Sequence, residues 1–299
     1  MRPLTLVVGV CVVASTLWSA TALAQPELVA RAIAEARQTG DEVALVHLAD
    51  EIGPAGVAEC LEHAGRSGRI LCAQAARYVD ESWAVLPVLV SALDDHDRQV
   101  ASCAAESATV LLLSMQPEVL GPQEPLPEEA EELLDRLRRL AGDSRFSLDI
   151  RAQVVVITGT LARLVGSSTE VPRRALEDSE VVVRRAAVGV LVGRTEPEDV
   201  SALVEAVLHD RDLLVVAQAA AGVCEATLGA GAALPEPVAE RIGALLRDRR
   251  TRPSQLQPLL ACLARSDHGQ AVALQRLAAQ HPSEAVRAVW SELTAEERP

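Results

Sequence analysis

The sequence predicts an all-α protein, an α-solenoid in which helical hairpins stack into a right-handed superhelix. Three observations support this fold class. Two apolar segments separated by an acidic turn recur along most of the chain. Apolar residues within each segment follow helical spacing, and the alternation typical of strands is scarce. A short recurring unit that cannot bury its apolar face alone indicates a stacked array.

Residues 1–24 have the organisation of a secretory signal peptide. Arg2 precedes an almost unbroken apolar run from Leu4 to Ala20, and Ala22-Leu23-Ala24 offers small residues before a cleavage site. We expect cleavage after Ala24 and export to the periplasm or the extracellular medium. The alternative is an uncleaved membrane anchor, but the run is short for a span and has no basic flank after it.

Residues 25–299 are expected to form one repeat domain, soluble after cleavage and monomeric. All 28 basic residues of the chain are arginine, against 42 acidic residues, and the formal net charge is −14. Because there is no lysine, a lysine Schiff base and a lysine-dependent phosphate loop are excluded. The acidic excess repels nucleic acid and anionic lipid, so we expect neither as a partner.

The branched residue that opens each second helix marks the repeats. We assign these marks to Leu71, Val100, Ile150, Val183, Val215, Leu256 and Val286. Most successive marks lie about 30 residues apart, as in arrays of short helical pairs. The clearest first helices are expected over 86–93, 171–176 and 203–208. The marks therefore predict roughly seven helical pairs.

The turns inside the pairs are acidic. Residues 94–97, 177–178 and 209–212 each precede a second helix, where aspartate can cap free N–H groups and suits the helix dipole. The histidine and aspartates of the first and third turns could also bind a cation. We interpret all three segments as helix-capping turns and predict no metal and no other cofactor.

An acidic, proline-rich insertion at about 115–130 interrupts the array. It holds four prolines and several glutamates between Pro117 and Glu132. We interpret it as a surface loop within one array, and a linker between two sub-arrays is the alternative.

These copies resemble the HEAT repeat family, particularly its short bacterial form in the phycobilisome-lyase-like HEAT proteins. The resemblance rests on the leucine-rich first helix, the Asp-x-Asp turn and the Val-Arg-x-x-Ala-Ala second helix, over about 54–113 and 128–294. In that family, the turn aspartate and the arginine after the branched residue form a ladder between repeats. Arg151, Arg184 and Arg287 match this arginine. Ala101 and Val216 do not, so the resemblance implies an interrupted ladder.

Five cysteines follow the leader, and two of them flank a turn. Cys60 and Cys72 lie on either side of Arg66-Ser67-Gly68, so a disulfide between them could join the two helices of a hairpin. The alternative is that the cysteines are buried as small apolar residues.

The basic cluster of the chain consists of Arg247, Arg249, Arg250 and Arg252. It could contact an anion or an acidic partner, since guanidinium groups pair well with carboxylate and phosphate. The alternative is a solvated loop whose cations suit the end of the preceding helix.

No catalytic arrangement is evident, because the chain has neither G-x-S-x-G nor C-x-x-C. We therefore expect no catalytic residues and a protein that is not an enzyme. The predicted function is an exported scaffold that binds a protein or peptide on the concave surface of its second helices. Two alternatives stay open. One is a lyase or chromophore-handling enzyme, as the resemblance implies, and the other is a purely structural envelope component.

Overall fold

The computed structural model describes residues 30–31, 33–35, 42–80, 82–115, 129–143 and 145–296. The predicted signal peptide lies outside the described residues, and so does most of the acidic insertion. Within the described ranges all regular structure is helical, and the chain divides into two compact units, Met1–Glu129 and Ala130–Pro299. The all-α prediction is confirmed.

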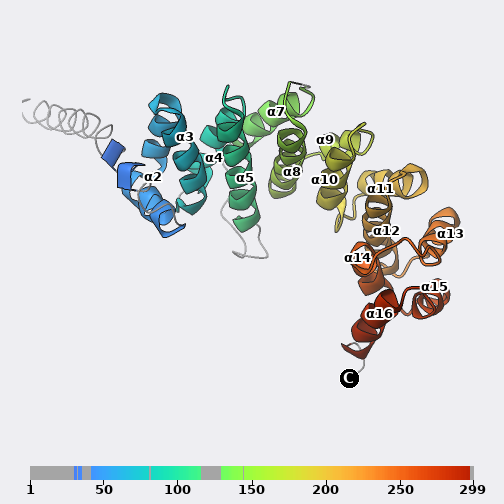
Figure 1. Cartoon of the computed structure of the whole chain (residues 1–299). Helices are drawn as coiled ribbons and strands as arrows, with labels where there is room; N and C mark the ends of the chain where they lie inside the picture. The colour runs from blue at the N-terminus through green and yellow to red at the C-terminus, as the bar shows by residue number, and fades with distance from the viewer. Residues whose placement is uncertain are drawn as a thin grey trace, which may run out of the picture. The chain divides into compact units, whose positions relative to one another are not determined.

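The first unit contains two pairs of helices among its described residues (Figure 1). Its elements are α2 (Glu42–His63), α3 (Arg66–Ala75), a short 3-10 helix (Ala76–Tyr78), α4 (Ser82–Ala92) and α5 (Arg98–Ser114). Helix α2 packs against both α3 and α4, and α5 packs against α3 and α4. The second helices α3 and α5 therefore lie side by side, as stacking of hairpins requires.

Helix α2 consists of two segments joined at Gly53. This residue has φ 59° and ψ −172°, a conformation that is open essentially to glycine alone. Pro54 follows and starts the second segment, where its missing N–H costs little. The second segment is the first helix of a hairpin with α3, and the repeat pattern in the sequence begins at this same proline.

The described residues of the second unit form five pairs of helices. They are α7 (Glu129–Ala141) with α8 (Leu148–Val165), α9 (Glu170–Ala175) with α10 (Val181–Leu191), α11 (Pro197–His209) with α12 (Leu213–Leu228), α13 (Glu236–Leu245) with α14 (Pro253–Ala264), and α15 (Gly269–Ala279) with α16 (Glu284–Glu296). Second helices α8, α10, α12, α14 and α16 pack in sequence, and first helices α11, α13 and α15 do the same (Figure 1). Each unit is thus a stack of helical pairs of the α-solenoid type.

Five of the seven predicted marks fall at one place in the second helices, whereas Leu71 is the sixth residue of α3 and Leu256 the fourth of α14. Val100, Ile150, Val183, Val215 and Val286 are each the third residue of their helix, and each is buried. A buried β-branched side chain therefore recurs at the same position of these five helices and marks the repeat. The seven predicted pairs are confirmed for the described residues.

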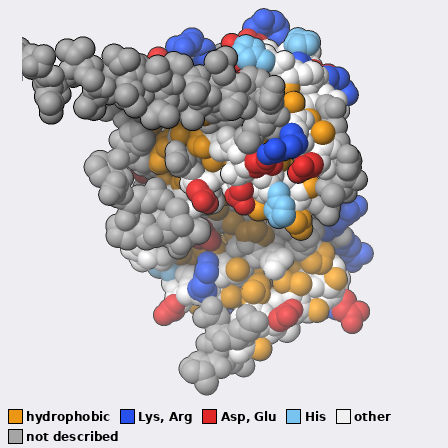
Figure 2. All heavy atoms as spheres, turned by 90° about the vertical axis from the view of Figure 1, so that its left-hand side faces the viewer, with side chains coloured by type: hydrophobic (Ala, Val, Ile, Leu, Met, Phe, Trp, Pro, Cys, Tyr) orange, Lys and Arg blue, Asp and Glu red, His pale blue; other side chains and the backbone are white. Residues whose placement is uncertain are grey.

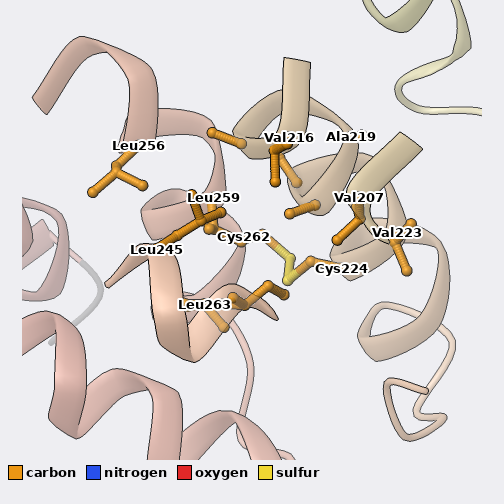
Figure 3. Packing of buried hydrophobic residues seen from close by; sticks show 14 of the residues in the cluster. Val207, Val216, Ala219, Val223, Cys224, Leu245, Leu256, Leu259, Cys262 and Leu263 are labelled. Carbon is orange, nitrogen blue, oxygen red and sulfur yellow. A yellow bond between two sulfur atoms is a disulfide. The ribbon is translucent and has the colours of Figure 1, made fainter. Parts of the chain in front are cut away.

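One buried apolar cluster of the second unit extends along the stacked helices from α10 to α16, and Figure 3 shows part of it. On α12, Val216, Ala219 and Val223 follow helical spacing, and Leu256, Leu259 and Leu263 do the same on α14. All six lie in one buried cluster. Fully burying a leucine or valine side chain contributes roughly 1.5–3 kcal/mol, so this interface is held mainly by apolar contacts.

Candidate functional site

An arginine on one second helix reaches the turn of the next pair. On α10, Arg184 donates from Nε to Asp210 Oδ2 at 2.7 Å and from Nη2 to Asp210 Oδ1 at 3.2 Å. Its Nη1 donates to the carbonyl oxygens of Asp178 and Ser179 at 2.9 and 3.0 Å. One planar guanidinium therefore joins two consecutive turns, a geometry suited to arginine.

The same contact recurs in two other places. Arg151 on α8 pairs with Asp178, and Arg69 on α3 donates to Asp95 at 2.9 Å. The partners are 26 or 27 residues apart in the three contacts. Each of these aspartates also accepts a hydrogen bond from the backbone N–H two residues later, which fixes the turn.

Two of the three arginines named from the sequence thus lie in the ladder, and Arg287 lies elsewhere. Arg287 donates to the carbonyl oxygens of His281 and Pro282 in its own turn, at 2.6 and 3.3 Å. Arg69 was not expected in the ladder, because it precedes the mark Leu71 instead of following it. The sequence pattern, which looks for an arginine directly after the mark, therefore did not identify Arg69 as a ladder residue.

Parallel contacts reach the capping aspartates of the second helices. Arg185 donates to Asp212 at 2.7 Å, and Arg66 donates to Asp97 at 2.5 Å. Asp212 also accepts from Val215 N as the cap of α12. The hydrogen bond from Arg185 lowers the pKa of Asp212 against the opposing effect of partial burial. These aspartates are therefore held ionised, as a capping carboxylate should be.

Turns without a ladder arginine have a local substitute. Arg145 pairs with Asp143 at 2.6 Å, and Arg250 pairs with Asp248 at 2.7 Å, in each case two residues after the aspartate. The hydrogen bond from Arg250 lowers the pKa of Asp248 to about 2. These contacts show what two arginines of the basic cluster bind within the protein. Arg250 is engaged in its own turn, and Arg252 donates its backbone N–H to Gln255 Oε1 at the start of α14.

Arg247, Arg249 and Arg252 are exposed, and the hydrogen bond from Arg252 to Gln255 involves its backbone N–H, not its guanidinium. An anion or an acidic partner could therefore reach three guanidinium groups of this cluster. The face turned to the viewer in Figure 2 carries acidic, basic and hydrophobic side chains interspersed with one another.

A buried carboxylate links the first helices α9 and α11. Asp199 is fully buried and accepts hydrogen bonds from Arg173 Nη1 at 2.7 Å, Arg194 Nε at 2.5 Å and Thr169 Oγ1 at 2.5 Å. Burial alone would raise the pKa of Asp199, but these three donors together lower it. Two arginines compensate one desolvated carboxylate, which is the condition under which a buried charge is tolerated.

An open cleft of about 600 Å³ lies between two consecutive pairs of the second unit. Its walls come from α9 and α11 and from the turns that follow them, and Arg184 of the ladder contributes to its lining. We call it the inter-repeat cleft. Apolar contributions come from Leu176, Ala202 and Ala206, while the rest of the lining is polar or charged. It is the kind of concave, mixed surface at which ligands bind.

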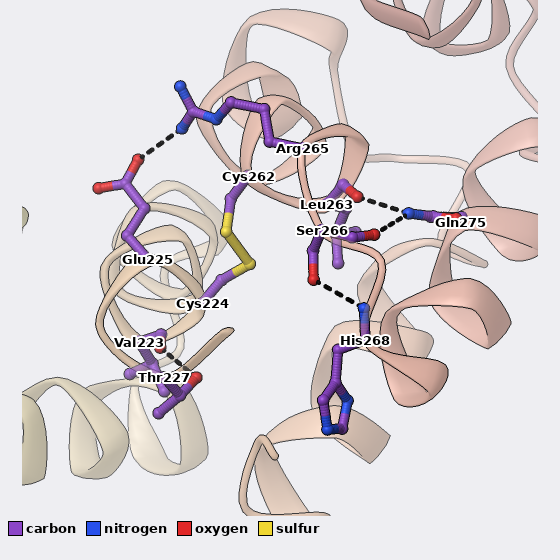
Figure 4. The surroundings of a disulfide bond; sticks show 10 residues. All are labelled: Val223, Cys224, Glu225, Thr227, Cys262, Leu263, Arg265, Ser266, His268 and Gln275. Carbon is purple, nitrogen blue, oxygen red and sulfur yellow. Dashed lines mark hydrogen bonds and ion pairs between the residues drawn. A yellow bond between two sulfur atoms is a disulfide. The ribbon is translucent and has the colours of Figure 1, made fainter. Parts of the chain in front are cut away.

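A second surface is formed by the exposed sides of α10, α12 and α14, which we call the second-helix surface. Its centre carries small or uncharged residues that are at least partly exposed, namely Ala186, Gly189, Gln218, Gln257, Pro258 and Ala261. Ion pairs border it on two sides. Arg185 meets Asp212 near the start of α12, and Arg265 meets Glu225 at 3.4 Å near the ends of α12 and α14 (Figure 4).

Two disulfides connect helices within the core. Cys60 and Cys72 are joined within the hairpin of α2 and α3. Cys224 on α12 and Cys262 on α14 are joined between successive pairs, 38 residues apart, inside the apolar cluster (Figure 3). The second disulfide was not expected, because its cysteines flank no common turn. Cys103 is the free cysteine of the described residues; it is buried, and burial raises the pKa of its thiol.

Among the described residues, no three histidine, cysteine or carboxylate side chains are grouped as metal ligands would be. The acidic turns instead use their carboxylates on arginine and backbone N–H groups, as the ladder contacts illustrate. In the same part of the chain, no helix combines the length and the apolar character that crossing a membrane requires.

Comparison with family models gives no match, and comparison with curated proteins gives none either. Among solved structures, the chain is similar to human deoxyhypusine hydroxylase in complex with glycerol. The two share 15% identical residues over 92% of this chain and 99% of the other, with a TM-score of 0.33.

This match corrects one expectation from the sequence. We expected that the protein is not an enzyme, but the matched structure is that of an enzyme, so that expectation is withdrawn. A fold of itself hosts many functions, and at this TM-score no reaction, substrate or residue role is carried over to this chain.

Proposed function

We propose that the protein is an exported HEAT-like repeat scaffold whose second-helix surface binds a protein or peptide partner. The observation that carries this proposal is the strip of uncharged residues, most of them small, across α10, α12 and α14, with ion pairs on two of its sides. Small side chains let a partner approach the helices closely, and the flanking charges can fix its orientation.

Rigidity favours such a role. The strip is supported from below by the apolar cluster and by the Cys224–Cys262 disulfide between α12 and α14. A surface that is already ordered loses little conformational entropy when a partner binds, so more of the contact energy appears as affinity.

Export is supported by the cysteines as well as by the leader. Disulfides persist in oxidising compartments, and four of the five cysteines after residue 24 are paired. We propose cleavage after Ala24 and a periplasmic or extracellular location. N-terminal sequencing of the protein from its natural host should begin at Gln25, whereas a chain that begins at Met1 in the membrane fraction would contradict this.

Binding is tested by affinity capture with matched variants. A Cβ at Gly189 meets no atom within 4 Å, so Gly189→Arg leaves the fold intact while placing a bulky charge on the second-helix surface. The control is Ala244→Arg, at an exposed position of the first helix α13. A partner retained by the wild type and by the control but lost from Gly189→Arg supports the proposal.

Retention of the same proteins by all three forms would place binding on a different surface. Photo-crosslinking from position 258 then decides directly, because Pro258 is an exposed residue of the strip on α14. A partner that crosslinks from position 244 and never from 258 would refute the proposal.

A further inference from the structure

The inter-repeat cleft is a second place where this protein can bind. It lies between first helices α9 and α11 and the turns that follow them, so its walls differ from the second-helix surface. Its volume of about 600 Å³ is large enough for several side chains of an extended peptide. What it can bind follows from which of its charges are already engaged.

Most charges of the cleft are neutralised within the protein. Arg173 is paired with Asp199 at 2.7 Å, and Arg184 is paired with Asp210 at 2.7 Å. Asp178 is paired with Arg151 of the preceding second helix. These groups shape the cleft, but they offer little charge to a ligand because each has its counter-ion in contact.

The charges that stay available are mainly negative. Within the described part of the chain, the exposed Glu177 makes no ion pair. Glu205 is 67% exposed and its contact is His209 at 3.2 Å, which is charged only when protonated. Arg211 is an exposed cation on the rim. The available charges are thus two carboxylates and one guanidinium. Glu177 comes from the turn after α9 and Glu205 from α11, so an entering cation finds acceptors from both elements that form the cleft.

The apolar part of the lining adds a second requirement. Leu176, Ala202 and Ala206 lie in the same cleft as the two carboxylates. A ligand that suits both has an aliphatic stem and a cationic end, which describes the side chains of arginine and lysine. Arginine fits best, because its guanidinium can bond to more than one carboxylate oxygen at once.

We propose that the inter-repeat cleft binds an arginine-bearing extended segment of another protein, with the guanidinium between Glu177 and Glu205. An anionic ligand is disfavoured here, because the Nε and both Nη atoms of Arg184 already donate to Asp210, Asp178 and Ser179. This site is separate from the second-helix surface and does not depend on it.

The test uses the chain after removal of residues 1–24 and three fluorescent heptapeptides, measured by anisotropy at low salt. The peptides have alanine and glycine throughout except at two positions, which carry arginine, citrulline or glutamate. Citrulline keeps the shape of arginine but lacks its charge. Arginine peptide should bind about tenfold more tightly than citrulline peptide, since a charge-assisted hydrogen bond pair is worth that much.

Matched variants locate the site. The double variant Glu177→Gln/Glu205→Gln should weaken binding of the arginine peptide about tenfold. The control Glu236→Gln/Glu240→Gln makes the same change of charge at two exposed positions of α13 and should leave binding unchanged. Circular dichroism verifies that both variants keep the helical content of the wild type.

Three results would overturn the proposal. They are equal affinity for the arginine and citrulline peptides, equal weakening by the two double variants, and no binding of the arginine peptide at millimolar concentration. Gly189→Arg separates this proposal from the proposed function, because it should abolish capture of the partner through the second-helix surface and leave binding of the arginine peptide intact.

Discussion

Arg184 and Asp210 form a two-point ion pair between consecutive helical pairs, with the guanidinium 18% and the carboxylate 5% exposed. The same guanidinium bonds to the carbonyl oxygens of the preceding turn. One side chain therefore fixes the distance between two turns. Because the partners are shielded from water, this contact is worth more than an ordinary surface salt bridge.

Replacing this arginine by lysine should destabilise the second unit. Arg184→Lys keeps the charge but loses the planar fork, so the bonds to Asp210 and to the carbonyls cannot all form. We expect a loss of about 1–2 kcal/mol in the free energy of unfolding, measured by chemical denaturation with circular dichroism. The exposed Arg249→Lys is the control and should change stability by less than about 0.5 kcal/mol. If both variants lost the same free energy of unfolding, the hydrogen-bond geometry of Arg184 would contribute nothing to stability beyond its charge.

Two glycines of neighbouring helices should respond oppositely to alanine. A Cβ at Gly159 on α8 would clash with Val190 Cγ1 and would lie 2.8 Å from Pro172 Cγ, whereas a Cβ at Gly189 on α10 meets nothing. Gly159→Ala should therefore destabilise the protein by about 1–3 kcal/mol through overpacking. Gly189→Ala should stabilise it by about 0.5–1 kcal/mol through helix propensity. Thermal denaturation of both variants checks the signs, and a stabilising Gly159→Ala would show that α8 and α10 are not in close contact.

The two disulfides should differ in their contribution to stability. Loop-closure entropy predicts about 3 kcal/mol for a bridge across 12 residues and about 4 kcal/mol across 38 residues. Cys224→Ala/Cys262→Ala should therefore lower the denaturation midpoint of its unit more than Cys60→Ala/Cys72→Ala lowers that of the other unit. Mass spectrometry before and after alkylation first establishes which cysteines are paired, and free thiols at positions 224 and 262 in the native protein would contradict the structure.

His281 occupies the place that aspartate holds in the turns of other pairs. It is fully buried, and its Nδ1 accepts a hydrogen bond from Ser283 N at 3.0 Å. Its Nε2 has no hydrogen-bond partner among the described residues. The charged groups that act on the ring are Asp248 from the preceding pair, itself held by Arg250, and Arg287 from α16. Burial lowers the pKa of His281 from its ordinary value of 6.5.

This histidine should make the last pair of helices sensitive to acid. Since the folded pKa lies below the unfolded one, the unfolded chain binds the proton more readily. Stability from this group is complete above pH 6.5 and is lost as the pH falls towards the lowered pKa. Protonation of Nδ1 also removes the acceptor for Ser283 N. Between pH 7 and pH 5 the denaturation midpoint should therefore fall.

The variant His281→Asn isolates this effect, because the asparagine oxygen can still accept from Ser283 N but does not titrate. In a Trp83→Phe background without the leader, Trp290 on α16 is the remaining tryptophan, and its fluorescence follows the last pair. The midpoint should depend less on pH in His281→Asn than in the parent. His47→Asn, at an exposed position of α2, should keep the dependence of the parent. An unchanged dependence in His281→Asn would exclude a role for this ring.

The elements of this fold could be predicted from the sequence, because each depends on a local pattern. The apolar spacing on α12 and α14, the capping residues Asp97 and Asp212 and the buried branched residue at the third position of five second helices are all properties of short segments. The Cys60–Cys72 pairing could also be suggested, because a short turn brings the ends of a hairpin together.

The contacts between pairs could be predicted only in part. Arg151 and Arg184 were found because they follow the mark directly. Arg69 occupies another position and reaches the equivalent aspartate Asp95, and Arg185 reaches the capping aspartate Asp212. The buried Asp199 gave no signal, because an aspartate near the start of a helix also suits the helix dipole in solvent. Two aspartates near the start of a helix can therefore differ in burial, and the sequence alone does not distinguish them.

The sequence by itself determined that the chain folds into paired helices and roughly where the second helix of each pair lies. Only the tertiary structure decided which arginine meets which aspartate, that Cys224 lies against Cys262, and that a cleft opens between α9 and α11. The reason is that helix formation depends on residues a few positions apart. The partners in these contacts are 26 to 38 residues apart and meet only when the stacking of neighbouring pairs sets their register.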